Sequence, residues 1–126
     1  VQADLYIIML GTNDSKPMNW QYAGSQGEKY ERELEALVRS YQELPPHPTV
    51  FLMQPPKAFS DKYTIQDGTI REDIHQAVAD VAEKTGSSLI DLYAFTEHHP
   101  EWFPDGIHPN AQGNEALAGM IRARIR

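Results

Sequence analysis

An aspartate and a histidine, Asp105 and His108, stand three residues apart near the end of this 126-residue chain. An aspartate at this spacing can turn back across the Gly106 bend and accept a hydrogen bond from the imidazole Nδ1, which leaves Nε2 free as a general base. Pro109 favours an extended backbone at His108 and presets a helix start. The segment therefore predicts the acid-base half of a hydrolytic triad. The alternative is an ordinary surface loop that opens a helix.

A second polar segment follows an apolar run near the start of the chain. Residues 5–10 are apolar and of strand length, and the polar segment 11–15 follows them directly. Ligands of open α/β sheets collect where such buried parallel strands end. The side-chain amide of Asn13 can donate to an oxygen that gains charge during acyl transfer, and it does not titrate. The alternative is that Asn13 and Asp14 only satisfy the backbone of their own turn.

Together, the two segments resemble blocks of the SGNH hydrolases, also called the GDSL family. Residues 11–14 match the family's Gly-x-Asn-Asp block after a sheet strand, and Asp105 with His108 matches its Asp-x-x-His block before the last helix. The resemblance covers essentially the whole chain. Within the family, the chain resembles the sialate O-acetylesterase-like enzymes or related carbohydrate acetylesterases.

The resemblance implies a serine esterase that removes acetyl or short acyl groups from carbohydrate. It implies that His108 and Asp105 are catalytic and that Asn13 donates to the oxyanion hole. Gly11 and Asp14 are possible supports of the loop that carries Asn13. The expected partner is a small-molecule ester, such as an acylated sugar.

The family's nucleophile is not found in these residues. Its serine lies in a Gly-Asp-Ser stretch that precedes the Gly-x-Asn-Asp block, and an early glycine completes the oxyanion hole. No serine of this chain follows a Gly-Asp pair, and Ser15 lies only two residues from Asn13, an unfamiliar arrangement for a nucleophile. We therefore expect residues 1–126 to be the C-terminal part of a single SGNH hydrolase domain. We expect activity to require a missing N-terminal segment with two strands and the serine.

Composition narrows the classes of partner and cofactor. The net charge of −7 disfavours nucleic acid and anionic membrane surfaces. No segment approaches the roughly 18 to 20 apolar residues of a membrane span. The chain has no cysteine, and His98 and His99 are adjacent rather than at metal-ligand spacing. We expect no cofactor and no metal. The compartment stays open, with a secreted or periplasmic location favoured over the cytoplasm.

The elements that must position these residues alternate along the chain. Apolar runs predict strands at about 4–10, 49–53 and 88–92, and helical spacing predicts helices over about 30–44 and 70–81. Gly86 is the expected stop of the second helix, and a last helix should turn Leu117, Met120, Ile121 and Ile125 inward. This order predicts an α/β fold with a parallel sheet. The resemblance implies a three-layer, flavodoxin-like sheet, of which this chain supplies about the last three strands.

Aromatic residues near the two polar segments are possible walls of a sugar pocket. They are Trp20, Tyr22, Trp102 and Phe103, and packing support is the favoured alternative for the last two. Two rival functions stay open: a non-catalytic SGNH-like ligand-binding module, and an unrelated flavodoxin-like domain in which Asn13 and Asp105 are ordinary loop residues.

Overall fold

Three parallel strands form the sheet of the computed structural model, which describes residues 3–20 and 26–126 apart from the side chain of Gln26. The strands are β1 (Leu5–Ile8), β2 (Thr49–Gln54) and β3 (Ser88–Asp91), in the order β1-β2-β3. Tyr6 pairs with Val50 in register, and Leu52 pairs with Leu89. The α/β class and the three expected strands are confirmed. The middle strand, β2, has a neighbour on each side.

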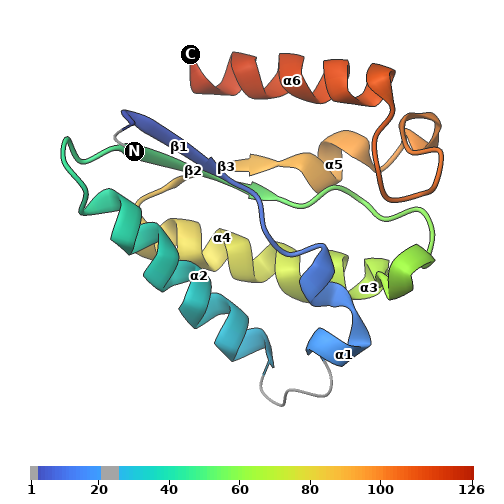
Figure 1. The fold of residues 1–126 in the computed structure, drawn as a ribbon, viewed down its shortest axis with the longest axis horizontal. Coiled ribbons are helices and arrows are strands. Elements are labelled where there is room, and N and C mark those ends of the chain that lie inside the picture. Colours follow the sequence, from blue (N-terminus) through green and yellow to red (C-terminus); the bar gives the residue numbers. More distant parts are fainter. Residues whose placement is uncertain (1–2, 21–25) are drawn as a thin grey trace.

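Helices cover both faces of the sheet (Figure 1). One face carries α2 (Gln26–Gln42) and α4 (His75–Thr85), and α6 (Ala111–Ile125) crosses the other. The shorter helical segments are η1 (Asn13–Ser15), α1 (Pro17–Trp20), η2 (Lys62–Thr64), α3 (Asp67–Thr69), the π-helical η3 (Ile70–Ile74), α5 (Leu92–Thr96) and η4 (Pro100–Trp102).

The core lies between the sheet and the pair α2 and α4. Tyr30, Leu34 and Val38 recur at every fourth position of α2 and are all buried, as the helical periodicity predicted. They meet the buried side chains of Val50 and Leu52 from β2. Each fully buried aliphatic side chain stabilises the fold by roughly 1.5 to 3 kcal/mol. The core therefore fixes β2 firmly against these two helices.

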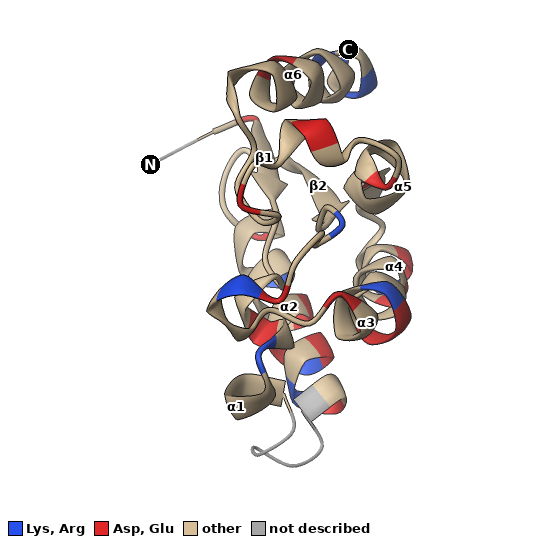
Figure 2. Cartoon of the chain, turned by 90° about the vertical axis from the view of Figure 1, so that its right-hand side faces the viewer, with Lys and Arg blue, Asp and Glu red and all other residues tan. Residues whose placement is uncertain are grey.

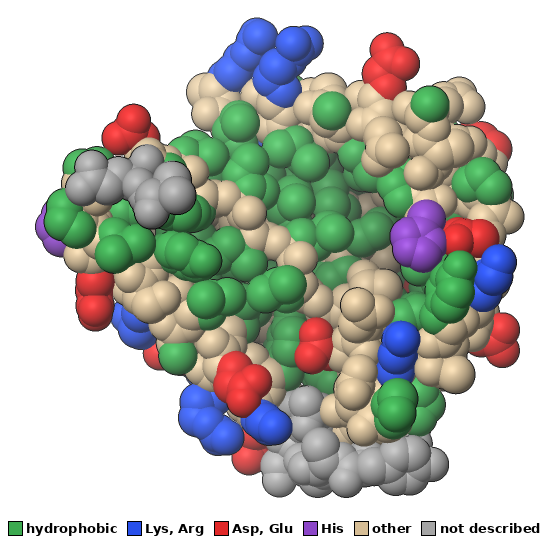
Figure 3. Space-filling view, viewed as in Figure 1, with side chains coloured by type: hydrophobic (Ala, Val, Ile, Leu, Met, Phe, Trp, Pro, Cys, Tyr) green, Lys and Arg blue, Asp and Glu red, His purple; other side chains and the backbone are tan. Residues whose placement is uncertain are grey.

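The opposite face of the sheet is only partly covered by α6. Gly113 is the buried residue of that helix, whereas the four apolar residues expected to face inward keep partial exposure. In Figure 3, hydrophobic side chains gather in a hollow between α6 and the sheet. The strand end at Met9 and Leu10 is 41% and 51% exposed. This face is therefore the more open side of the molecule.

Element boundaries differ from expectation by a few residues, and contacts explain the ends of β3 and α4. Strand β3 ends at Asp91 because the Asp91 carboxylate accepts the N–H of Ala94 at 2.9 Å and so caps α5. The predicted helix over 70–81 begins as η3 and continues as α4. It stops at Gly86, whose φ of +70° gives the expected left-handed cap.

Charged side chains of both signs lie mainly on the outer surface of the helices. Figure 2 shows acidic residues spread over α2, α3, α4 and the loops rather than gathered on one face. Within residues 3–20 and 26–126, no helix combines the length and the hydrophobicity needed to cross a membrane.

Candidate active site

The Asp105 carboxylate and the His108 ring form a hydrogen-bonded pair. Asp105 Oδ2 lies 2.7 Å from His108 Nδ1. An ionised carboxylate can only accept, so Nδ1 carries the proton and donates it. The other oxygen, Oδ1, accepts the backbone N–H groups of Ile107 at 2.7 Å and His108 at 2.6 Å. Nε2 is therefore left as the basic nitrogen, on a side chain that is 68% exposed.

Three donors on one carboxylate fix its charge state. The backbone N–H of His108, then its ring, then the N–H of Ile107 hold the pKa of Asp105 well below its usual range. Asp105 is therefore an anion at neutral pH.

The loop that carries this pair is held by its own backbone and by α6. Gly106 adopts φ of +88°, and its N–H donates to the carbonyl of Phe103 at 2.9 Å. Asn110 caps α6 by accepting the N–H of Gly113 at 2.8 Å. The turn and the cap fix both ends of the segment that presents His108.

Asn13 begins η1, in the loop that follows β1. Its carbonyl accepts the Asn19 amide at 2.9 Å, while no described residue bonds to its own side-chain amide. Upstream, the Tyr30 hydroxyl donates to the Leu10 carbonyl at 2.7 Å. Gly11 adopts φ of +144°, and a Cβ there would lie 2.8 Å from Ile74 Cγ2. The loop is therefore anchored from several sides while the Asn13 amide stays available.

One cleft brings Asn13 and His108 together. The cleft measures about 480 Å³ and lies between the sheet and α6. Asn13 and His108 both line it, and apolar side chains such as Met53, Leu117 and Ile121 supply much of the rest. Asn13 of an early loop and His108 of a late loop therefore border the same space, although they lie near opposite ends of the chain.

Ser15 is buried inside the early loop and does not face the cleft. It is 1% exposed, and its Oγ donates to the Thr12 carbonyl at 2.7 Å. The same oxygen accepts the N–H of Gln66 at 3.0 Å. This hydroxyl holds two loops together and is inaccessible to a substrate.

A bridging segment, residues 58–66, connects the two loops, and sequence reasoning missed it. At one end, the N–H of Phe59 donates to the Gly106 carbonyl and the Ser60 hydroxyl donates to the Asp105 carbonyl, each at 2.8 Å. At the other end, Gln66 bonds to Ser15. No motif or spacing in the sequence marks these residues, because their role depends on backbone groups of distant loops.

A partly buried ionic group holds the base of the bridging segment. Asp67 Oδ1 accepts the N–H of Ala58 at 2.9 Å, and Oδ2 accepts Lys57 Nζ at 2.9 Å and the Tyr93 hydroxyl at 2.8 Å. The hydrogen bond to Asp67 raises the pKa of Lys57. Asp67 therefore fixes the chain at the point where the bridging segment begins.

Among the described residues, the other predicted loop and pocket residues lie outside the cleft lining. The Asp14 side chain borders a hollow beside Tyr30, and burial raises its pKa. Trp102 and Phe103 are buried, with the Trp102 ring stacked on His99 at 3.8 Å between centroids. Phe103 packs on Phe59 at 5.5 Å.

Trp20 and Tyr22 complete the set of predicted pocket residues. The Trp20 ring packs against that of Tyr30, with 5.8 Å between centroids, and borders a different hollow beside α2 and α4. Tyr22 lies outside the described residues. Placement against a sugar therefore stays a prediction for both.

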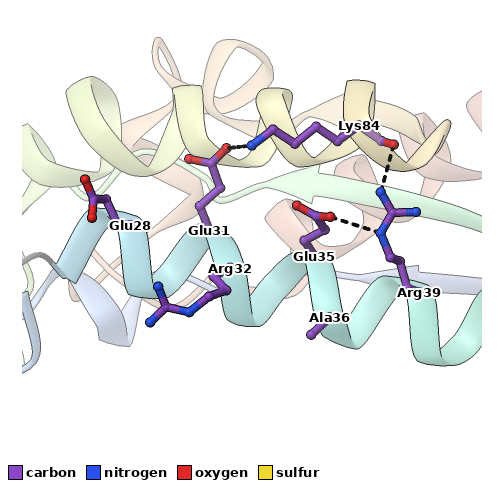
Figure 4. A pocket seen from close by; sticks show the side chains of 7 residues that line it. All are labelled: Glu28, Glu31, Arg32, Glu35, Ala36, Arg39 and Lys84. Atoms are coloured by element: carbon purple, nitrogen blue, oxygen red, sulfur yellow. Dashed lines mark hydrogen bonds and ion pairs between the residues drawn. The ribbon is translucent and has the colours of Figure 1, made fainter.

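A charged groove between α2 and α4 is explained by ion pairs on its own surface (Figure 4). Lys84 Nζ pairs with Glu31 at 2.9 Å, and Arg39 Nε pairs with Glu35 at 3.0 Å. Surface pairs of this kind add little to stability, because water screens the two charges. In the described part of the chain, no group of three or more His, Cys, Asp or Glu side chains is placed to hold a metal ion.

Known proteins resemble this chain in sequence and in fold. The sequence profile of the GDSL-like lipase/acylhydrolase family matches residues 1–116. A curated acetylxylan esterase from Xylanibacter ruminicola is 32% identical over 141 aligned positions, which cover 98% of this chain and 28% of the relative. The chain thus spans little more than a quarter of that protein's length.

Solved structures show the same architecture. The crystal structure of the acetylxylan esterase AlAXEase superposes with a TM-score of 0.76 at 22% identity, over 98% of this chain and 67% of its own. A lipase/acylhydrolase from Enterococcus faecalis superposes with a TM-score of 0.77 at 23% identity, over 97% and 60% of the two chains. At these identities the likeness concerns the fold.

Proposed function

The chain belongs to the GDSL-like lipase/acylhydrolase family, and from that premise we propose that its protein is a serine esterase that removes acetyl groups from carbohydrate. The observation that carries the proposal is the cleft lined by both Asn13 and His108. The name of the curated relative, an acetylxylan esterase, supports an acetylated polysaccharide or oligosaccharide as the substrate class.

In the proposed reaction, His108 acts as base and then as acid. Its Nε2 takes the proton of a serine hydroxyl as that oxygen attacks the ester carbonyl. The ring then returns the proton to the departing sugar oxygen, and an acetyl-enzyme remains. Water attacks the acetyl-enzyme with the same base, releasing acetate and freeing the serine. Asp105 holds the ring in the required tautomer and stabilises its cation.

Asn13 is the proposed oxyanion donor. Asn13 lines the cleft that His108 also lines, and no described residue accepts from the side-chain N–H groups of Asn13. A donor aimed at the tetrahedral oxyanion stabilises the transition state by about 3 to 4 kcal/mol. Gly11 supports this donor by allowing the loop to pass close to Ile74.

We propose that the serine comes from a segment preceding this chain, and that residues 1–126 form the C-terminal part of one domain. Two features support this arrangement. Ser15 is engaged in holding loops together, and the apolar residues Ile7, Met9 and Leu10 along and after β1 are 38% to 51% exposed. A further strand beside β1 would cover them and bring a residue to the cleft.

A serine-directed probe tests the proposal. The full-length protein is treated with a fluorophosphonate, and the labelled residue is located by mass spectrometry. We expect one serine outside residues 1–126 to be labelled, with labelling abolished by His108→Ala. In parallel, acetate release from acetylated xylo-oligosaccharides should depend on His108. A label on a serine within this chain would contradict the external nucleophile. Sugar binding with neither label nor acetate release would favour a non-catalytic module.

A further inference from the structure

Two consecutive residues of the bridging segment adopt a left-handed backbone. Tyr63 has φ of +59° and Thr64 has φ of +62°. Glycine, asparagine and aspartate accept this conformation readily, whereas aromatic and β-branched residues rarely do. Such strain persists only where surrounding contacts impose it, and it is common at functional sites. Contacts with the rest of the fold must therefore hold the turn over residues 62–64 in this conformation.

Contacts on both sides impose this turn. The N–H of Lys62 donates to Ser60 Oγ at 3.3 Å, and that hydroxyl bonds to the Asp105 carbonyl. On the other side, Ile65 is 1% exposed and anchors the chain in the core, while Gln66 bonds to Ser15. The position of Tyr63 is thus set by the same loops that carry Asp105 and Asn13.

The turn presents the Tyr63 ring beside His108. The two ring centroids lie 5.7 Å apart with an interplanar angle of 72°, an edge-on contact. Tyr63 nevertheless stays 52% exposed. A large aromatic side chain that contacts the proposed base and keeps half of its surface open has area left for a ligand.

The proton transfer at His108 indicates which part of an ester would lie beside the Tyr63 ring. If the proposed function holds, His108 Nε2 donates its proton to the alcohol oxygen, so the alcohol part of the ester lies next to His108. Asn13 would instead contact the carbonyl oxygen. Tyr63 is not part of the lining of the cleft but adjoins it through its contact with His108. An alcohol group that extends past His108 would therefore meet the Tyr63 ring.

We propose that Tyr63 is a specificity-determining residue that packs against the sugar ring of the alcohol part of the substrate. The C–H faces of a sugar are apolar enough to gain from covering an aromatic ring. The contact selects for esters with a bulky cyclic alcohol and leaves the acyl group undiscriminated. This inference rests on the proposed esterase function and names the side of the site that recognises the sugar.

Two substrates and three variants test the inference in the full-length protein. Tyr63→Asn removes the ring and suits the left-handed backbone, and Tyr63→Phe keeps the ring. Lys62→Ala also keeps the ring but removes the ammonium group that lies 5.5 Å from its centroid. We expect Tyr63→Asn to lower kcat/KM on acetylated xylo-oligosaccharides about tenfold, the value of burying one sugar face. On ethyl acetate the loss should be under about twofold. Tyr63→Phe and Lys62→Ala should stay within about twofold on both esters.

The possible outcomes are distinguishable. An equal loss on both esters would mean that Tyr63 only positions His108, and no loss on either would mean that it has no role; both overturn the inference. A wild-type protein that hydrolyses neither ester overturns the proposed function and this inference with it. Thermal unfolding of each variant checks the fold. If Tyr63→Asn is unstable, Tyr63→Gly repeats the test with a residue better suited to the turn.

Discussion

The Ser60 hydroxyl donates to the main-chain carbonyl of Asp105 at 2.8 Å, although the two residues are far apart in the sequence. This bond fixes the peptide just before the Gly106 turn, and so it fixes the direction of the carboxylate that orients His108. The pair links the middle of the chain to its candidate catalytic loop.

Ser60→Ala should lower kcat by roughly three- to tenfold and the free energy of unfolding by about 1 kcal/mol. It removes the partly buried hydrogen bond to the Asp105 carbonyl and the longer, exposed one from the Lys62 N–H. Ser40→Ala is the matched control, since the Ser40 hydroxyl also donates to a carbonyl, that of Leu37 at 2.6 Å, but on α2. Steady-state kinetics and urea unfolding of both variants measure the effects. Equal kcat values for the two variants would contradict the positioning role.

Gly106→Ala should be among the most destabilising single changes in the chain. A Cβ at Gly106 would collide with the side chain and backbone of Ser60, and φ of +88° is unfavourable for alanine. We expect a loss of about 2 to 4 kcal/mol in unfolding free energy. In Gly119→Ala, by contrast, the added Cβ meets nothing within 4 Å and should stabilise α6 by up to about 1 kcal/mol. Chemical denaturation of both variants gives the comparison, and similar stabilities would refute the packing argument.

Asp105→Asn should destabilise the protein in a pH-dependent way. The folded pKa of Asp105 lies below its unfolded value, so folding favours the anion. The stability that the anion contributes is fully present above the unfolded pKa of about 3.9, and it is lost as the pH falls through the lower folded pKa. The stability gap between wild type and Asp105→Asn should hold from pH 7 to about pH 5 and shrink below about pH 4.

Urea unfolding at several pH values measures this gap. The exposed Asp61, for whose side chain no hydrogen bond is found among the described residues, gives the control variant Asp61→Asn. That variant should change little at any pH. A gap for Asp105→Asn that widens in acid would reverse the expected sign and reject the carboxylate as the cause.

Asn13→Ala in the full-length enzyme should lower kcat by about a hundredfold or more with little change in KM, because an oxyanion donor acts in the transition state. Asn19→Ala is a useful comparison, since the Asn19 amide bonds to the Asn13 carbonyl and only supports the loop. Its effect on kcat should be several times smaller. Full activity of Asn13→Ala would remove this residue from the proposed mechanism.

The sequence was sufficient for the parts of the structure that depend on short-range patterns. The Asp105 and His108 pair is local, because a glycine bend between them allows the contact at three residues' spacing. The buried faces of α2 and the stop at Gly86 also follow from periodicity and from the conformational freedom of glycine. The placement of Asn13 near His108 followed from the rule that parallel strands end at a common edge.

The bridging segment could not be predicted for the opposite reason. Ser60 and Ser15 bond to backbone atoms, which every residue has, so no residue type marks their partners. Tyr63 has a side chain that disfavours its observed backbone, and local propensity therefore pointed away from the turn. Long-range contacts of the neighbouring residues outweigh this local preference of Tyr63.

The unequal surroundings of the strands affect how readily their amides exchange with solvent. Strand β2 is bonded on both sides, so its amide protons should be among the last to exchange with deuterium. On β1, the amides that point away from β2 have no strand partner among the described residues, and they should exchange orders of magnitude sooner. If a further chain segment pairs along β1, the exchange of those amide protons should be the first to slow.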